Sequence, residues 1–227
     1  MSANKSHFEA LDPAGSFRVA SWNLLRRIGA EAQDVAKLVH AYRPDLLLLQ
    51  EATEEIAALP SLVGGHFFRH PMQKRIYGLA AWSPHPFPST SALRLPASVL
   101  PGRVPPRIAQ IVKFQGICFA NVHLSHGQLM NRRQLRLIAG HLPFSAMIIG
   151  DCNMVGPALL PGFRDIGARG PTHDMGKVVP LRLDRCFVRN LSHVRAEILG
   201  KAGSDHAPIA VWLDGQSPRP GADSAQG

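Results

Sequence analysis

The sequence predicts a single α/β domain in which strands and helices pack as a sandwich. Short apolar runs with strand character alternate with a few amphipathic stretches, which is typical of an α/β sandwich and not of a helical bundle or an all-β barrel. The 227 residues are enough for one large domain with a sizeable core. Hydrophobic residues make up 45% of the chain and charged residues 18%, an ordinary globular composition that argues against global disorder.

Two polar ends flank the predicted domain. Residues 1–15 lack the apolar core of a signal peptide, and residues 215–227 are rich in Pro, Gly, Ser and Ala without an apolar period, so we expect both to be disordered tails. The folded domain is therefore expected at residues 16–214, with no long linker and no internal repeat. No apolar run approaches the ~20 residues needed to cross a membrane, so we expect a soluble protein.

The first half of the chain alternates strands with helices. Residues 17–23 alternate apolar and polar positions, as a half-buried strand does. Residues 30–42 place five apolar side chains on one helical face, and Pro44 ends that helix because proline cannot continue it. Residues 45–50 (DLLLLQ) form a fully apolar short run, as expected for a strand buried on both faces. The remaining elements of this half are a short helix at 52–59 and a strand at 77–83.

The second half begins with a proline-rich segment. Residues 83–106 hold many of the 19 prolines, so we expect a long loop or an edge strand there. Two β-rich runs at 107–114 and 117–123 are separated by Gln-Gly, which indicates a hairpin. Residues 127–141 are expected to form a helix with a basic side. The closing strands are expected at 146–149, 181–188, 193–198 and 206–213.

The chain is basic and poor in cysteine. Its formal net charge of +9 favours polyanionic partners, namely nucleic acid, an anionic membrane surface or phosphorylated small molecules. The three cysteines, Cys118, Cys152 and Cys186, are far apart and odd in number. This pattern predicts no disulfide framework, and a reducing cytoplasm is the simplest setting for it.

Several predicted strands end in a polar or acidic residue. The strand ends carry Asn23, Glu51, His123 and Asp151, and Asn153 follows two residues after the last of these. Loops at strand ends are where α/β proteins assemble their sites, so these residues are candidates for a common site. Each also has a simpler interpretation: a solvated strand end for Glu51, an Asx turn for Asp151 and a core histidine for His123.

Asp184 is harder to explain without a function, because it lies within an otherwise apolar strand, LRLDRCFV. A buried carboxylate is costly unless it is paired. His206 in the triplet Ser204-Asp205-His206 is the predicted partner, since a carboxylate can hold an imidazole in one tautomer and one orientation.

Taken together, these residues favour metal-assisted hydrolysis of a phosphate ester. Carboxylate and amide oxygens without a cysteine cluster suit Mg²⁺, with Mn²⁺ as the alternative, and do not suit structural zinc. A carboxylate would hold the metal, histidines and amides would bind phosphate oxygens, and an aspartate would take the proton from water.

The order of the motifs W-N, Q-E, N-x-H-L-S, G-D-x-N, L-D-R and S-D-H-x-P resembles that of the endonuclease/exonuclease/phosphatase superfamily. The resemblance runs from about Phe17 to Leu213. It implies a DNase-like, four-layer α/β sandwich, in which two packed mixed β-sheets are flanked by helices and the active site lies at one edge of the sheets. It also implies that residues 16–214 are the catalytic domain.

The resemblance further implies a role for each candidate catalytic residue. Asp151 would position or deprotonate the attacking water, and Asn153 would hold the phosphate or the nucleophile. His206, oriented by Asp184, would contact the scissile phosphate. His123 would be a second phosphate-contacting or acid histidine. AP endonucleases of the superfamily carry a tyrosine at the position of His123, so the resemblance favours the DNase-, sphingomyelinase- and phosphatase-like members.

The expected metal ligands and substrate contacts complete the site. The resemblance implies that Glu51 is the principal metal ligand, with Asn23 beside it and Asp205 assisting. The candidates for the substrate groove are His126, Arg132 and Arg133, for which a solvated helix face is the alternative. Residues 172–173 are a further candidate for a substrate-side loop.

Three functions follow as alternatives. The first is a nuclease that cleaves phosphodiester bonds in DNA or RNA, which the charge favours. The second is a phospholipid- or sphingomyelin-type phosphodiesterase, or a phosphatase of small phosphorylated metabolites, which the same centre could serve; a basic face also suits an anionic bilayer. The third is an inactive binding protein, against which all the candidate catalytic residues are present. No obligate protein partner is evident.

Overall fold

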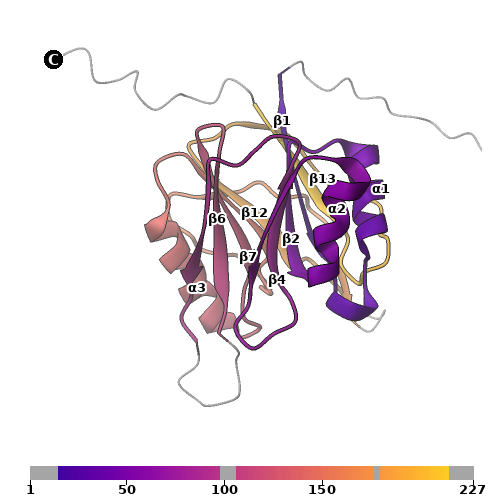
Figure 1. Cartoon of the computed structure of the whole chain (residues 1–227). Helices are drawn as coiled ribbons and strands as arrows, with labels where there is room; N and C mark the ends of the chain where they lie inside the picture. The colour runs from indigo at the N-terminus through magenta and orange to yellow at the C-terminus, as the bar shows by residue number, and fades with distance from the viewer. Residues whose placement is uncertain (1–14, 98–105, 176–178, 215–227) are drawn as a thin grey trace, which may run out of the picture.

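The computed structural model describes residues 15–97, 106–175 and 179–214. These residues form two six-stranded mixed sheets packed face to face, with helices on the outer faces (Figure 1). The predicted four-layer sandwich is therefore confirmed. The tails predicted at residues 1–15 and 215–227 fall outside the described residues except for Gly15, so the domain bounds remain a prediction.

The first sheet combines the N-terminal strands with the last two strands of the chain. β1 and β2 are parallel, and the other neighbouring pairs are antiparallel. In the described residues its spatial order is β13 (His193–Ile198), β14 (Ile209–Leu213), β1 (Phe17–Asn23), β2 (Leu46–Ala52), β4 (Gly78–Ser83) and β3 (His66–Pro71).

The second sheet is built from the middle of the chain. β7 and β8 are parallel, and the other pairs are antiparallel. Its order in the described residues is β5 (Ser89–Arg94), β6 (Ile108–Phe114), β7 (Ile117–His123), β8 (Ala146–Asp151), β12 (Asp184–Arg189) and β9 (Arg164–Asp165). A separate two-stranded hairpin consists of β10 (His173–Met175) and β11 (Val179–Leu181).

Helices cover both outer faces of the sandwich. Figure 1 shows α1 and α2 on one side of the strands and α3 on the other. α1 (Ala32–Tyr42) and α2 (Leu59–Val63) pack on the first sheet, and α3 (Gln128–His141) packs on the second. Two 3₁₀ helices complete the described fold, η1 (Arg26–Ile28) and η2 (Glu54–Ala58). No helix among the described residues is long and apolar enough to span a membrane.

The position of β2 between the helices and the second sheet explains its continuous apolar sequence. Leu47 and Leu49 face the layer of α1 and α2, whereas Leu46 and Leu48 face the second sheet, and all four are fully buried. A strand covered on both faces needs apolar residues at every position, which explains the sequence DLLLLQ. The three tryptophans (Trp22, Trp82 and Trp212) lie in the core beneath α1 and α2.

Several elements differ from the sequence-based expectation. The strand predicted at 181–188 divides, because Leu181 ends β11 and β12 begins only at Asp184. The strand predicted at 206–213 begins at Ile209, which leaves His206 in the preceding loop. Within the proline-rich segment, residues 89–94 pair with β6 as an edge strand, β5, while residues 98–105 lie outside the described residues. The edge strand β3 had not been predicted.

The strand directions bring the candidate residues to one edge of the sandwich. β1 ends at Asn23, which is the register partner of Gln50 near the end of the parallel strand β2. In the second sheet, His123 at the end of β7 is the register partner of Asp151 at the end of β8, and Asp151 is in turn the partner of Asp184. Both sheets therefore contribute functional groups to the same edge.

Candidate active site

A pocket with a volume of about 310 Å³ opens at this edge, between the two sheets. Most of the candidate residues line it; Asp184 lies just behind, against His206. The lining residues are Asn23, Leu25, Glu51, His123, His126, Gln128, Asp151, Asn153, Val155, His173, Leu181, Leu183, Asp205 and His206. The structure therefore brings most of the candidate residues together in one pocket.

The predicted pair of Asp184 and His206 is confirmed. Nδ1 of His206 lies 2.8 Å from Oδ2 of Asp184, and both residues are buried. Because an ionised carboxylate only accepts hydrogen bonds, Nδ1–H is the donor, and Nε2 is left on the opposite side of the ring, 3.9 Å from Asp151 Oδ2. Burial alone would lower the pKa of His206, but Asp184, assisted by Asp151 and Asp205, raises it to about 9.

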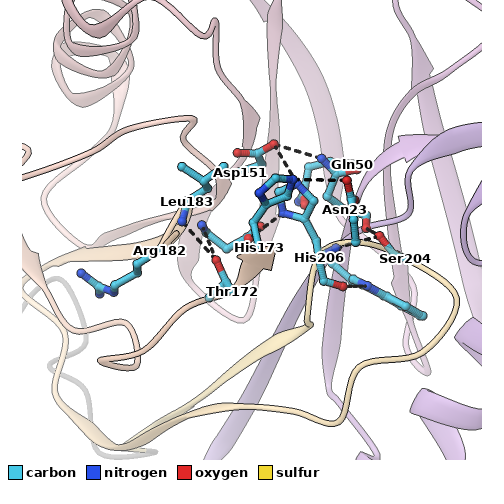
Figure 2. A network of polar contacts seen from close by, with 12 residues as sticks. Asn23, Gln50, Asp151, Thr172, His173, Arg182, Leu183, Ser204 and His206 are labelled. Atoms are coloured by element: carbon cyan, nitrogen blue, oxygen red, sulfur yellow. Dashed lines mark hydrogen bonds and ion pairs between the residues drawn. The ribbon is translucent and has the colours of Figure 1, made fainter. Parts of the chain in front are cut away.

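The loop that carries His206 is fixed by neighbours from the first sheet (Figure 2). Ser204 Oγ donates to the carbonyl of Asn23 at 2.7 Å and accepts from the backbone N–H of His206 at 3.1 Å. Trp22 Nε1 donates to the carbonyl of His206 at 2.9 Å. Both sides of the His206 backbone are therefore held, so the ring position is set by the fold and not by a ligand.

Asp151 is the most deeply embedded carboxylate of the pocket. Its Oδ1 accepts from the backbone N–H of Asn153 at 2.9 Å, and its Oδ2 accepts from Asn23 Nδ2 at 3.0 Å and from Asn153 Nδ2 at 3.3 Å. His123 Nε2 is 3.4 Å from the same Oδ2. Burial raises the pKa of Asp151, opposed by the nearby His206. A carboxylate with a raised pKa is a better proton acceptor.

Asn153 owes its position to a backbone that non-glycine residues seldom adopt, with φ of 46°. Its side-chain amide donates to the carbonyl of Leu124 at 3.0 Å, and its own carbonyl accepts from Asn131 Nδ2 at 2.8 Å. Such strained positions persist only where the surroundings hold them, and they concentrate at functional sites.

Glu51 lies at an irregularity of β2, where the pairing with β4 shifts register between Leu49 and Ala52. Its φ of 54° is again in the left-handed region. A bulge of this kind redirects a side chain, and here it brings the carboxylate into the pocket, with Oε1 3.9 Å from His123 Nδ1. Burial raises the pKa of Glu51, and Arg26, whose Nε is 4.0 Å from Oε2, opposes that effect.

His123 is an electrically neutral imidazole between two carboxylates. Burial, followed by the positive charge of Arg107, places its pKa well below the ordinary value. Its Nδ1 is buried and has no hydrogen-bond partner in the structure. A neutral ring with an unsatisfied nitrogen is suited to contact a ligand.

The donor atoms of the pocket fit a hard divalent cation. Oε2 of Glu51 and Oδ1 of Asp205 are buried oxygens without a hydrogen-bond partner, and both carboxylates line the pocket. Buried carboxylate oxygens without a hydrogen-bond partner are costly, and a Mg²⁺ or Mn²⁺ ion would satisfy them. Among the described residues, two groups of three side chains have ligand atoms within 4.8 Å of one another and could hold a metal, namely Asp151 with Asp184 and His206, and His173 with Asp205 and His206; neither includes Glu51.

Both polar atoms of the Asn23 side chain are already engaged in hydrogen bonds, one of them with the carboxylate of Asp151. While its Nδ2 bonds Asp151, its Oδ1 accepts from the backbone N–H of Leu25 at 3.1 Å. Direct ligation of a metal by Asn23 would use the second lone pair of that oxygen, so this predicted role stays a prediction.

The predicted substrate contacts divide into two sets. His126 lines the pocket, but Arg132 and Arg133 do not. The Arg132 guanidinium donates to the backbone carbonyls of Gln128, Val155 and Pro157 at 2.8 to 3.0 Å. It therefore fixes the loop that follows Asn153, whereas Arg133 is exposed on α3. Substrate binding by these two arginines stays a prediction.

A buried network of polar side chains, formed by Ser21, Gln50 and Asn121 and called the polar seam below, joins the two sheets and was not predicted from the sequence. Gln50 Nε2 donates to Asn121 Oδ1 at 2.7 Å and to Ser21 Oγ at 2.9 Å, and so joins β2 to β7 and β1. Asn121 Nδ2 in turn donates to the carbonyls of Leu49 and Ala80. The signal was present in the motifs, where a glutamine precedes Glu51 and an asparagine lies two residues before His123.

Arg107 is a second group whose influence on the site the sequence did not predict. It is only 5% exposed, its Nε is buried without a hydrogen-bond partner, and its NH1 reaches only the sulfur of Met72 at 4.0 Å. Burial lowers its pKa, while Tyr77, Asp151 and Glu51 act in the opposite direction. Arg107 is not among the residues that line the pocket, but its positive charge interacts with the carboxylates of Glu51 and Asp151, which do.

A larger cavity, of about 790 Å³, lies beneath residues 156–163. Its acidic residue, Asp165, is bound by Arg182 at 2.7 and 2.8 Å and by Arg185 at 3.0 Å. These salt bridges lower the pKa of Asp165 against the effect of its burial, and they leave the carboxylate engaged. This cavity therefore lacks the convergent free groups found at the sheet edge.

Residues 20–206 match the Endonuclease/Exonuclease/phosphatase family, and the chain belongs to that family. A search among curated protein sequences gives no significant match.

The similar solved structures share the fold at low sequence identity. An endonuclease/exonuclease/phosphatase from Beutenbergia cavernae has a TM-score of 0.71 at 19% identity, covering 88% of this chain and 72% of the other. D. rerio TDP2, complexed with a single-strand DNA product, gives 0.68 at 16%, covering 87% and 98%. The Bacteroides thetaiotaomicron mannosyl-6-phosphatase Bt3783 gives 0.70 at 18%, covering 87% and 99%. These structures show the shared fold, and the family match identifies the chain as a phosphate-ester hydrolase of that family.

Proposed function

We propose that this chain is a Mg²⁺-dependent phosphodiesterase that hydrolyses nucleic acid, DNA or RNA, by in-line attack of water. The observation that carries the proposal is the convergence, in one pocket, of Asp151 held by two asparagines, His206 held by Asp184, and a carboxylate oxygen of Glu51 that has no hydrogen-bond partner. These groups are the acceptor, the charged donor and the metal ligand that the reaction needs.

The metal would be held by Glu51 and Asp205, with Asn23 beside them. A bound Mg²⁺, or Mn²⁺ in its place, supplies Lewis-acid stabilisation of the negative charge on the phosphoryl oxygens. The buried Arg107 guanidinium, on the Glu51 side of the pocket, adds a fixed positive charge to the same region.

Asp151 would accept the proton of the attacking water. Its two oxygens are directed by Asn23 and Asn153, so the carboxylate is preorganised, and its raised pKa makes it a better base than an exposed aspartate. Direct attack by water avoids a covalent enzyme intermediate, and none of the groups around the pocket is an activated serine or cysteine nucleophile.

His206 would stabilise charge on the scissile phosphate through Nε2. A pKa of about 9 keeps its ring protonated at neutral pH, and Asp184 holds it in one orientation. The low pKa of His123 supports a neutral hydrogen-bonding role at the phosphate over the alternative role of a general acid.

A polymeric, negatively charged substrate accounts for the charge of the chain. The net charge of +9 favours a polyanion, and D. rerio TDP2, which has the same fold, has been observed with a single-strand DNA product. The buried thiols of Cys118, Cys152 and Cys186 suit a reducing setting, which supports the expected cytoplasmic location.

One observation favours a second candidate function, a phosphatase of small phosphorylated metabolites. The mannosyl-6-phosphatase Bt3783 resembles this chain as closely as the other structures do. The pocket, at about 310 Å³, is also large enough for a phosphorylated sugar. A third candidate substrate is a phospholipid in an anionic membrane, which the experiment below also includes.

The deciding experiment is a turnover panel in Mg²⁺ with plasmid DNA, single-stranded DNA, RNA, phospholipid vesicles, inositol phosphates and a hexose 6-phosphate. His206→Ala is the control for contaminating activity. Cleavage of nucleic acid that disappears in the variant supports the proposal. Turnover of lipid or sugar phosphates alone would reject the nuclease assignment and leave the phosphoesterase assignment in place.

A further inference from the structure

The β10–β11 hairpin brings a histidine outside the expected catalytic set into the pocket. The hairpin is bound to the loop that carries His206 by two backbone hydrogen bonds, from Ala207 N–H to the carbonyl of Thr172 at 2.7 Å and from Asp174 N–H to the carbonyl of Asp205 at 3.4 Å. His173 and His206 form a bridge between the two segments. This attachment fixes the backbone of His173 relative to Asp205 and His206.

The side chain of His173 contacts Asp205 directly. Its Nε2 lies 3.2 Å from Asp205 Oδ2, and because the carboxylate only accepts, Nε2–H is the donor. The ring also packs against the ring of His206, with centroids 4.4 Å apart, as Figure 2 shows for these two residues. The His173 side chain is 14% exposed, so solvent competes only weakly for this hydrogen bond.

This contact leaves the two oxygens of Asp205 in different states. Oδ2 is engaged by His173, whereas Oδ1 is buried and has no hydrogen-bond partner. Asp205 is otherwise the least enclosed carboxylate of the site, with 35% of its side chain exposed. Without His173 the Asp205 side chain would be free to rotate into solvent, because no other side chain is seen to bond either of its oxygens in the described residues.

We propose that His173 is a positioning residue for the metal ligand Asp205, and that its hydrogen bond sets the affinity of the site for a divalent cation. The inference rests on the proposed role of Asp205 at the metal. Hydrogen-bond partners that orient ligating carboxylates contribute strongly to metal sites, and their loss costs about 10- to 100-fold in affinity. In this chain, the hydrogen bond from His173 to Oδ2 of Asp205 would orient the carboxylate so that Oδ1 is available to the metal.

Two substitutions separate the hydrogen bond from the packing. His173→Phe keeps an aromatic ring against His206 but cannot donate to Asp205. His173→Gln loses the ring but places an amide N–H near the position of Nε2. Lys201→Ala is the matched control, because it removes the 2.8 Å ion pair to Asp174 that anchors the same hairpin without touching Asp205.

The measurement is the dissociation constant of Mn²⁺ and Mg²⁺ by titration calorimetry on the full chain without substrate, with the melting temperature in EDTA as a check on folding. We expect binding weakened about 10- to 100-fold in His173→Phe, and near the wild-type value in His173→Gln and Lys201→Ala. Unchanged binding in His173→Phe overturns the inference. So does equal weakening in His173→Gln or in Lys201→Ala, because ring packing or hairpin anchoring would then be the cause. If His173→Phe does not fold, His173→Leu takes its place; it cannot donate to Asp205 and keeps only an apolar side chain against His206, and His173→Gln, which also lacks the ring, remains the comparison that isolates the hydrogen bond.

Glu51→Gln distinguishes failure of this inference from failure of the proposed function. Loss of cation binding in Glu51→Gln together with unchanged binding in His173→Phe rejects only the positioning role. Unchanged binding in Glu51→Gln rejects the metal assignment of the proposed function. In hydrolysis assays His173→Phe should require more metal for half-maximal rate, while kcat at saturating metal falls much less.

Discussion

Replacement of Asp184 by asparagine tests the charged pair at the centre of the site. The amide has nearly the shape of the carboxylate but lacks its charge, so His206 loses the group that raises its pKa. The difference between a pKa of about 9 in the folded protein and the ordinary 6.5 corresponds to roughly 3 kcal/mol of folding free energy, at 1.36 kcal/mol per pKa unit. His206 is only 5% exposed, so solvent does little to reduce this figure.

The sign of the pH dependence follows from the direction of the shift. Because the folded-state pKa of His206 is raised, its contribution to stability is fully present below the ordinary pKa of 6.5 and is lost as the pH rises through about 9. Asp184→Asn should therefore be less stable than the wild type by roughly 3 kcal/mol at pH ~6, and the difference should shrink as the pH approaches ~9.5.

The assay is urea unfolding of both proteins across this pH range, in EDTA so that metal binding adds nothing to stability. Convergence of the two free energies of unfolding at high pH is the expected result. Curves that stay parallel from pH ~6 to ~9.5 would show that His206 is not held in its charged form by Asp184, and would remove the basis for a protonated His206 at the phosphate.

Three further predictions concern the base, the seam and the core. Asp151→Asn should lower kcat by roughly 10²- to 10⁴-fold while the melting temperature stays near or above the wild-type value; a rate within tenfold of wild type would contradict its role as base. Asn121→Leu should cost roughly 2–4 kcal/mol in urea unfolding, because the Leu49 and Ala80 carbonyls and Gln50 lose their partner; a neutral effect would mean that water replaces it. Leu47→Ala should cost roughly 2–5 kcal/mol in the same assay, with activity per folded molecule unchanged.

The sequence predicted those site residues whose immediate neighbours in the chain make them unusual, either because burial of their charge costs free energy or because they end an apolar strand. Asp184 stood out because a carboxylate in an apolar strand needs a partner, and the structure supplies His206 at 2.8 Å. Glu51 and Asp151 stood out because they end apolar strands. Parallel pairing of β1 with β2 and of β7 with β8 then brings those ends to one edge.

The parts that the sequence did not predict depend on contacts between distant segments. Residues 172–173 were expected only as a candidate substrate-side loop. The contact of His173 with Asp205, 32 residues further along the chain, was not predicted, because β10 has only three residues and gives no periodic signal. Arg107 follows the proline-rich segment, and its electrostatic interaction with Glu51 and Asp151 arises only when the chain folds. Arg132 had the expected charge, but its guanidinium is bound to the carbonyls of the loop after Asn153.

The most direct test of the account is the metal dependence of hydrolysis by the wild type and by Glu51→Gln. A labelled single-stranded oligonucleotide is the first substrate, and the rate is measured as Mg²⁺ is raised from zero in a chelating buffer. The account predicts no turnover in EDTA, saturable activation of the wild type, and a much higher Mg²⁺ requirement for the variant. Turnover that persists in EDTA, or identical Mg²⁺ curves for the two proteins, would contradict it.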